Sequence, residues 1–255
     1  MRESQLTTAH AKVPAVTTGF WIIKILATTL GETGGDTLSM TYEFGYLASS
    51  AIFIVPLILL IIAQVRARRF HPFLYWATII ASTTAGTTMA DFATRSLGIG
   101  YPGGSLLLLA CVLLTLFLWR AGTGSVAVES VYSPRAETFY WVAITFSQTL
   151  GTALGDWAAD DGGLGYLGGA ALFGGLLLLL LLLWRITAIN RVALFWSAFV
   201  LTRPLGATVG DFLDKPLSEG GLDFSRPVAS AVLAAAIILL IWLLPQRPAT
   251  SSAGS

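Results

Sequence analysis

The stretch FWIIKILATTLGETGGDT, residues 20–37, contains a pattern that recurs three more times along the chain. Its Trp is followed by a Gly ten residues later and by an Asp fifteen residues later. The same frame occurs in YWATIIASTTAGTTMADF (75–92), YWVAITFSQTLGTALGDW (140–157) and FWSAFVLTRPLGATVGDF (195–212). Four copies at one fixed spacing indicate an internal repeat, so the repeat is the first guide to the architecture.

The composition places this repeat in a membrane. The 255-residue chain is 55% hydrophobic and only 11% charged, whereas soluble domains are about one quarter charged. Eight apolar segments approach the ~20 residues with which a helix crosses a bilayer. They are residues 14–36, 44–64, 73–93, 103–120, 136–158, 164–184, 192–213 and 227–244. We therefore expect an all-α membrane protein in contact with the lipid bilayer, and the net charge of +1 gives no reason to expect a nucleic-acid partner.

The two kinds of segment alternate. The odd-numbered segments carry the Trp–Gly–Asp frame, and the even-numbered ones are apolar all round, which is typical of lipid contact or burial. We expect four helical hairpins, with the odd helices forming a polar core and the even helices an outer layer. A polar interval between the second and third copies indicates a linker between two halves. The expected parts are an N-terminal segment (1–13), repeats 1 and 2 (14–120), the linker (121–135), repeats 3 and 4 (136–244) and a polar tail (245–255).

Basic residues predict the orientation. They gather in the loops on one side of the expected bundle, around Arg66–Arg69, Arg120, Arg135 and Arg185, whereas the opposite loops carry acids such as Asp160. Because basic loops stay in the cytoplasm, both termini are expected there, and all four hairpins point the same way. The four Trp residues then lie near the cytoplasmic face, where an interfacial ring is expected.

A polar stripe runs along each odd segment. Positions seven, eleven and fifteen after each Trp share one helix face. They are Thr28, Glu32 and Asp36 in the first copy, Thr83, Thr87 and Asp91 in the second, Gln148, Thr152 and Asp156 in the third, and Arg203, Ala207 and Asp211 in the fourth. Lys24 extends the first stripe by one turn. Since such a stripe must face protein or a water-filled cavity, we expect a polar core, with close helix packing at the frame glycines Gly31, Gly86, Gly151 and Gly206.

The acids of this stripe are the candidate site for a cation or for protons. They are Glu32, Asp36, Asp91, Asp156 and Asp211. Only Lys24 and Arg203 oppose them within the column, so some negative charge is left for a bound ion. Oxygen ligands without His or Cys suit Mn²⁺, Mg²⁺, Ca²⁺, Na⁺ or H⁺, and Glu32, Asp36 and Asp156 are the expected metal ligands. Asp91 and Asp211 are expected to matter less, because Arg95 and Lys215 stand four residues after them and can pair with them on the helix surface.

The function expected from these features is transport of a small hard cation against protons. The chain has no nucleophile–base pair at a recognisable spacing, no P-loop and no HExxH motif, so neither an enzyme nor a cofactor is expected. Two other readings stay open: a membrane scaffold or regulator whose Gly-rich helices only pack, and a membrane enzyme that uses paired acids. In the scaffold reading the Asp residues end helices at the membrane surface and cap the following turn. Substrate identity, transport direction and whether the protein forms a homo-oligomer are not specified by the sequence.

The segment Val13–Thr33 and the copies at 151–157 and 202–212 resemble a bacterial family of uncharacterised multi-spanning membrane proteins built from a repeat of unknown function. This resemblance covers the whole membrane domain and implies a location in the cytoplasmic membrane of a bacterium. It implies little about activity. Residues 32–37, ETGGDT, are also loosely similar to the E-x-G-D-[KR]-[TS] signature of a manganese/calcium–proton exchanger family. Here one more residue separates the two acids, and no Lys or Arg follows them.

Overall fold

The computed structural model of the protein describes residues 11–250. The expected N-terminal segment (1–13) and polar tail (245–255) therefore fall partly outside the described residues.

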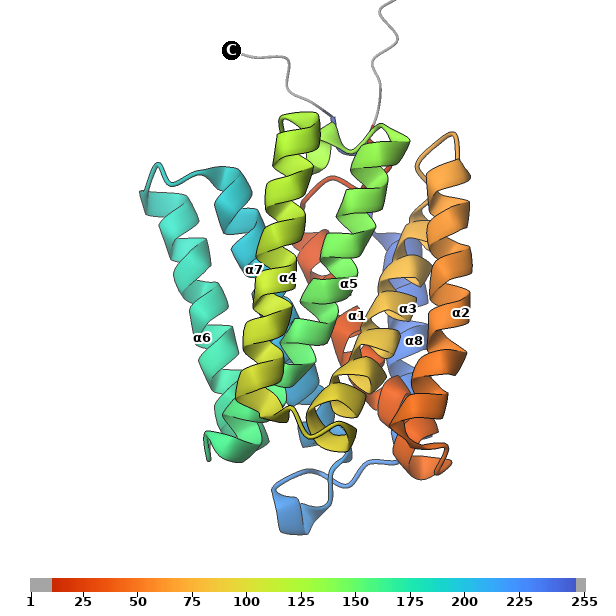
Figure 1. Ribbon diagram of the computed structural model, residues 1–255, viewed down its shortest axis with the longest axis vertical. Helices are drawn as coiled ribbons and strands as arrows, with labels where there is room; N and C mark the ends of the chain where they lie inside the picture. Colours follow the sequence, from red (N-terminus) through yellow and green to blue (C-terminus); the bar gives the residue numbers. More distant parts are fainter. Residues whose placement is uncertain (1–10, 251–255) are drawn as a thin grey trace, which may run out of the picture.

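Eight long α-helices make up most of the described chain and run along a common axis (Figure 1). They are α1 (Thr18–Asp36), α2 (Gly45–Arg66), α3 (Pro72–Asp91), α4 (Gly100–Thr123), α5 (Pro134–Asp156), α6 (Gly165–Ile186), α7 (Arg191–Asp214) and α8 (Arg226–Leu243). Five of them, α2, α4, α6, α7 and α8, are long and apolar enough to cross a membrane. The odd helices all begin with a side-chain cap, because Thr17, His71, Ser133 and Asn190 each accept a hydrogen bond from a backbone N–H of the first turn. The expected multi-pass, all-α architecture is confirmed.

The odd helices form a closed inner ring. Helix α1 packs against α3 and α7, and α5 packs against the same two helices. The even helices lie outside this ring, where α2 covers α3, α4 covers α5, α6 covers α7 and α8 covers α1. Their outward faces expose rows of Leu and Ile side chains, as lipid contact requires. The predicted polar core and apolar outer layer are therefore the arrangement found.

The repeat in the sequence and the unit of packing are not the same. Each even helix packs mainly on the odd helix of the next repeat, and α8 closes the circle on α1. The turn between the helices explains this offset. After the frame Asp, the first three odd helices continue as one wide π-turn (Thr37–Thr41, Phe92–Ser96, Trp157–Asp161). A Gly with positive φ (Gly45, Gly100, Gly165) then redirects the chain into the next helix, so the four repeats interlock.

The frame glycines set the spacing of the inner ring. A Cβ on Gly31 would collide with Thr83, and a Cβ on Gly151 would collide with Arg203. Likewise, a Cβ on Gly86 would press on the Gln148–Thr149 backbone, and one on Gly206 would collide with Thr28. Each Gly thus meets the residue seven positions after the Trp of the next odd helix. The contacts of repeats 1 and 2 recur in repeats 3 and 4 with a shift of 120 residues, so the two halves are related by an approximate two-fold axis.

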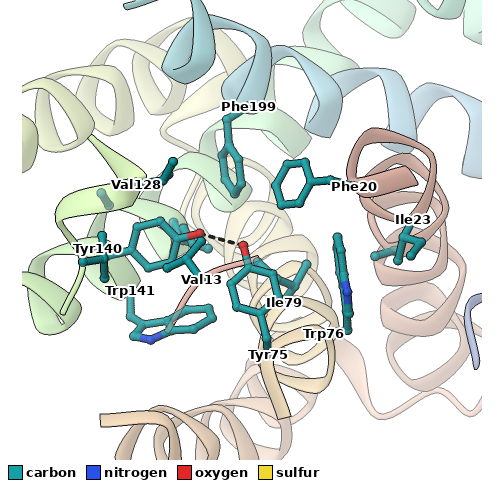
Figure 2. Close-up of a cluster of buried hydrophobic side chains, with 14 of the residues drawn as sticks. Val13, Phe20, Ile23, Tyr75, Trp76, Ile79, Val128, Tyr140, Trp141 and Phe199 are labelled. Atoms are coloured by element: carbon teal, nitrogen blue, oxygen red, sulfur yellow. Dashed lines mark hydrogen bonds between the residues drawn. The ribbon is translucent and has the colours of Figure 1, made fainter. Parts of the chain in front are cut away.

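The frame Trp residues were expected at the membrane interface, and this expectation was wrong for three of them. Trp76, Trp141 and Trp196 are 0%, 1% and 5% exposed, and Trp21 is half-buried. Each Trp is preceded by a second aromatic residue, and these rings pack edge-on and tilted against one another. Figure 2 shows part of this aromatic layer, with Phe20, Tyr75, Trp76, Tyr140 and Trp141 labelled. Packing large rings together buries more apolar area than placing them singly at the interface.

Two tyrosines join the halves across this aromatic layer. The hydroxyls of Tyr75 and Tyr140 point at each other and lie 2.6 Å apart (Figure 2). Residues near both ends of the described chain cover the layer. Val13 is buried against it, and Pro14 pairs with Pro248 in an isolated β-bridge. Lys12 forms an ion pair with Glu137 at 2.7 Å, so this end of the bundle is closed.

The predicted linker is also part of this closure. Val128 and Val131 are buried in the hydrophobic core, and Trp196 donates a hydrogen bond from Nε1 to the Val126 carbonyl at 2.9 Å. The segment between the two halves is therefore packed into the structure.

Candidate functional site

The predicted polar stripe faces the inside of the ring. All of its side chains, including Lys24, are buried. Asp36, Asp91 and Asp156 are the last residues of their α-helices, as the sequence suggested, yet none of them caps the following turn. The alternative in which these acids are surface helix caps therefore does not describe them.

The centre of the stripe is a four-helix polar cluster with one residue from each odd helix. Arg203 Nη2 of α7 lies 2.8 Å from Glu32 Oε2 of α1. The same nitrogen donates to Thr87 Oγ1 of α3 at 2.5 Å and to Thr152 Oγ1 of α5 at 2.6 Å. The cluster joins all four helices, and Arg203 finds the acidic partner that a charge inside a membrane requires.

Lys24 lies one turn nearer the aromatic layer and has a different environment. Its ammonium donates to Thr202 Oγ1 at 3.2 Å and sits 4.2 Å from the centre of the Phe199 ring. It makes no ion pair with any described residue, and its full burial rules out snorkelling to the surface. Of the two bases expected to balance the acids, only Arg203 does so by direct contact.

The remaining predicted core residues fill the space around these groups. Thr28 Oγ1 donates to the Thr202 carbonyl at 3.1 Å, and Thr83 Oγ1 donates to the Ala27 carbonyl at 3.1 Å, so both hydroxyls tie neighbouring odd helices together. Gln148 is fully buried, and neither its amide nitrogen nor its amide oxygen has a hydrogen-bond partner within residues 11–250.

The four frame Asp residues lie beyond this cluster, and each pair of them shares one cation. Arg95 is 3.0 Å from Asp91 of its own helix and 3.2 Å from Asp156 of α5. Lys215 is 3.1 Å from Asp211 of its own helix and 2.8 Å from Asp36 of α1. The predicted pairings four residues apart therefore exist. They are not confined to one helix, because both cations also bridge to the neighbouring repeat; Lys215 is buried there, whereas the Arg95 side chain stays 34% exposed.

This arrangement corrects the expected charge balance. The sequence suggested that five acids face two bases, but Arg95 and Lys215 bring the bases to four. Burial alone would lower the pKa of the Lys215 ammonium, yet the carboxylates of Asp211 and Asp36 raise that pKa well above its ordinary value. Lys215 is therefore a cation at neutral pH, and little uncompensated negative charge is left.

Two further charged residues join the site without having been predicted. Asp214, the last residue of α7, is buried, and Arg226 at the start of α8 reaches Asp214 at 3.3 Å and Asp36 at 3.9 Å. The sequence places them in a loop of mixed charge and gives no partner for either. The signal that could have identified Asp214 is its position one turn after Asp211 within an otherwise apolar helix.

Three carboxylates come together closely enough to hold one ion. Glu32, Asp36 and Asp211 each offer an oxygen within 4.8 Å of the others, and all three are buried. The sequence had grouped Glu32 and Asp36 with Asp156, but Asp156 lies with Asp91 on Arg95 instead. Asp36 Oδ1 has no hydrogen-bond partner among the described residues. These carboxylate oxygens suit a hard cation such as Mn²⁺, Mg²⁺, Ca²⁺ or Na⁺.

A partly open cavity of about 410 Å³ adjoins this group at the end of the bundle opposite the aromatic layer. Its walls include Asp211 and Lys215 together with Arg95, and Glu219 lines it from the loop after α7. Tyr46 and Tyr166, counterparts in the two halves, also line it. The carboxylates therefore lie beside a cavity at one end of the bundle, whereas the other end is closed.

The repeat also identifies the family. A family model described as Repeat of Unknown Function (DUF347) matches the chain four times, over residues 19–70, 74–123, 139–190 and 194–248. The chain belongs to this family. The matches coincide with the four Trp–Gly–Asp copies, as the resemblance noted from the sequence implied. Neither the curated proteins nor the solved structures contain a match to this chain.

Proposed function

We propose that this DUF347 protein is a transporter that moves a small hard cation across the membrane in exchange for protons. The cation binds at Glu32, Asp36 and Asp211. One observation carries the proposal, namely the meeting of three buried carboxylates within 4.8 Å in a membrane protein. An intramembrane ionisable group is functional by default because its burial is costly. The adjoining cavity gives an ion a way in from one end.

The charges around this group favour exchange. When ionised, the carboxylates of this group and its neighbour carry four negative charges (Glu32, Asp36, Asp211 and Asp214). The bases that contact them supply three positive ones (Arg203, Lys215 and Arg226). Close carboxylates in a medium of low dielectric constant cannot all stay ionised without a counter-charge. A bound cation or a proton supplies the missing charge, so the two compete for one site. Two similar four-helix halves around the site are an arrangement that transporters use for alternating access.

A second candidate is a non-transporting scaffold or regulator. The observation that favours it is that every acid of the stripe already has a basic partner. In that case the network only fixes the helices, and added cations change nothing. The chain is not proposed to be an enzyme, and a homo-oligomer is compatible with either function.

We also propose that the protein lies in the cytoplasmic membrane of a bacterium with the closed, aromatic end in the cytoplasm. The basic loops around Arg66 and Arg120 support this orientation. The test is labelling by a membrane-impermeant thiol reagent of Asp160→Cys, in a chain whose single cysteine is replaced by Ser. Labelling from outside the cell is expected, and labelling only from the cytoplasmic side would contradict the orientation.

Proteoliposomes test the transport activity. Purified protein is reconstituted with a pH gradient, and uptake of Mn²⁺, Mg²⁺, Ca²⁺ and Na⁺ is measured together with proton movement. We expect uptake of at least one of these ions by the wild type and its loss in Asp36→Asn. The matched control is Asp161→Asn, which removes an exposed acid near the same end and should transport normally. Absence of transport for all four ions, or equal loss in both variants, would count against the proposal.

A further inference from the structure

Lys215 stands in the position that a bound cation would take. Its Nζ lies between Asp36 Oδ2 at 2.8 Å and Asp211 Oδ1 at 3.1 Å, which are two of the three carboxylates of the candidate site. The second oxygen of Asp36 is buried and unpartnered within the described chain, so the site offers a ligand atom that the ammonium does not use. A metal ion binds several oxygens at once and can engage this spare atom.

The backbone of Lys215 is held by hydrogen bonds, whereas its side chain lines a cavity. Lys215 N donates to the Asp211 carbonyl, and Lys215 O accepts from Asp223 N, both at 2.9 Å. The residue follows the end of α7, and its side chain lines the cavity of about 410 Å³. Glu219 lines the same cavity from the same loop. This cavity is the space next to the ammonium, and Glu219 is a second carboxylate on its wall.

The equivalent cation of the other half is held differently. Arg95 contacts three acids, Asp91 and Asp156 and, at 3.7 Å, Asp160. Its guanidinium also lies 5.7 Å from the centre of the Tyr101 ring. A planar guanidinium that serves several carboxylates is a fixed cross-link, whereas a Lys ammonium is a compact charge on a flexible stem. The two half-sites are related by the repeat but differ in the kind of cation and in the number of acids that hold it.

We propose that Lys215 is a tethered counter-ion, which occupies the cation site of the empty protein and is displaced into the cavity when the transported cation binds. The proposal rests on the proposed function and identifies the residue that controls occupancy of the site. A tethered group competes at an effective concentration on the order of millimolar, so it sets the concentration at which an external cation can enter. Asp36 and Asp211 then face a positive charge in both states, and the proton of the exchange competes for the group's third carboxylate, Glu32, which the ammonium does not contact.

The test compares cation binding by four purified proteins in detergent: the wild type, Lys215→Met, Lys215→Arg and Arg95→Met. Melting temperature is recorded against the concentration of Mn²⁺, Mg²⁺, Ca²⁺ or Na⁺ alone. Removal of the competitor in Lys215→Met should lower the half-saturating concentration by about tenfold or more. Lys215→Arg should raise it or abolish the response, because a guanidinium is harder to displace. Arg95→Met, the matched change in the other half, should not lower it.

The outcomes separate the two proposals. In one outcome the wild type responds to a cation, but the half-saturating concentration in Lys215→Met is unchanged or higher. That result would overturn the proposal that Lys215 is a tethered counter-ion and would leave the cation site intact. No response in the wild type or in either Lys215 variant would overturn both. If Lys215→Met fails to fold, the charge-conserving Lys215→Arg carries the test, and an unchanged half-saturating concentration in that variant would refute the proposal.

Discussion

The two halves of the molecule share their backbone plan and differ in their charged groups. Helices α1–α4 and α5–α8 repeat the same frame with a shift of 120 residues. Gly31 packs against Thr83, and its counterpart Gly151 packs against Arg203, which is the counterpart of Thr83. At that equivalent position, however, one half has a hydroxyl and the other a guanidinium. The ammonium of Lys215 likewise corresponds to the guanidinium of Arg95.

The comparison separates what the fold requires from what one site requires. The close glycine contacts occur in both halves, as expected of features on which the interlocked ring depends. Charged groups that lack an equivalent in the other half are not needed for that ring and are the candidates for a function. The three-carboxylate group is unshared in this sense: it takes Glu32 and Asp36 from the first half and Asp211 from the second, and the equivalent place in the molecule has Thr152 where this group has Glu32. We therefore expect variants of shared features to affect folding in both halves, and variants of the unshared charges to act at one place.

The largest effect is expected at the glycines that both halves share. Gly31→Leu or Gly151→Leu puts a side chain where the next odd helix already lies. Overpacking typically costs about 1–3 kcal/mol where neighbours can shift. Here the first added atom already overlaps the neighbouring helix, so the cost exceeds that range, and complete loss of the folded protein is expected in size-exclusion chromatography and thermal melting. Gly174→Leu is the control, since a Cβ at Gly174 has nothing within 4 Å. Normal melting of both ring variants would mean that the halves do not pack as described.

The next effect concerns the Arg203–Glu32 pair, which joins the two halves and has no charged equivalent, because Thr83 and Thr152 stand at the matching positions. Arg203→Met leaves the Glu32 carboxylate buried without its partner, which typically costs about 3–5 kcal/mol. We expect a corresponding drop in the free energy of unfolding and recovery of most of it when Glu32→Gln is added. Thr83→Val, the matched change at the equivalent position, should cost less because no charge is left unpaired. A double variant no more stable than Arg203→Met would show that the pair is not coupled.

The smallest effect is expected in the aromatic layer. Tyr75 and Tyr140 share a hydrogen bond, whereas their counterparts Phe195 and Phe20 have no hydroxyl. Tyr75→Phe removes this bond and should lower the free energy of unfolding by about 1 kcal/mol. Tyr132→Phe, an exposed position, is the control. A loss at Tyr75 no larger than that at Tyr132 would show that the bond does not contribute to joining the halves.

The sequence predicted much of this architecture because the repeat carries a fixed period. The frame located the odd helices, and the helical spacing of Glu32 and Asp36 placed the acids on one buried face. The destinations of long side chains were not predictable in the same way. Arg95 and Lys215 were paired with the acids of their own helices, but their reach to Asp156 and Asp36 depends on how neighbouring repeats interlock. That interlocking is a property of tertiary packing and leaves no local pattern in the sequence.

The central claim is that one group of carboxylates, Glu32, Asp36 and Asp211, binds the cation. The most direct measurement is the melting temperature with and without saturating cation for the wild type and for Asn variants of Asp36, Asp91, Asp156 and Asp211. A ligand at 100 times its dissociation constant stabilises the folded state by about 2.7 kcal/mol. We predict that this stabilisation is lost in Asp36→Asn and Asp211→Asn and kept in Asp91→Asn and Asp156→Asn. This grouping differs from the one that the sequence favoured, Asp36 with Asp156. Equal cation responses in all five proteins, or loss in Asp36→Asn and Asp156→Asn alone, would contradict the site described here.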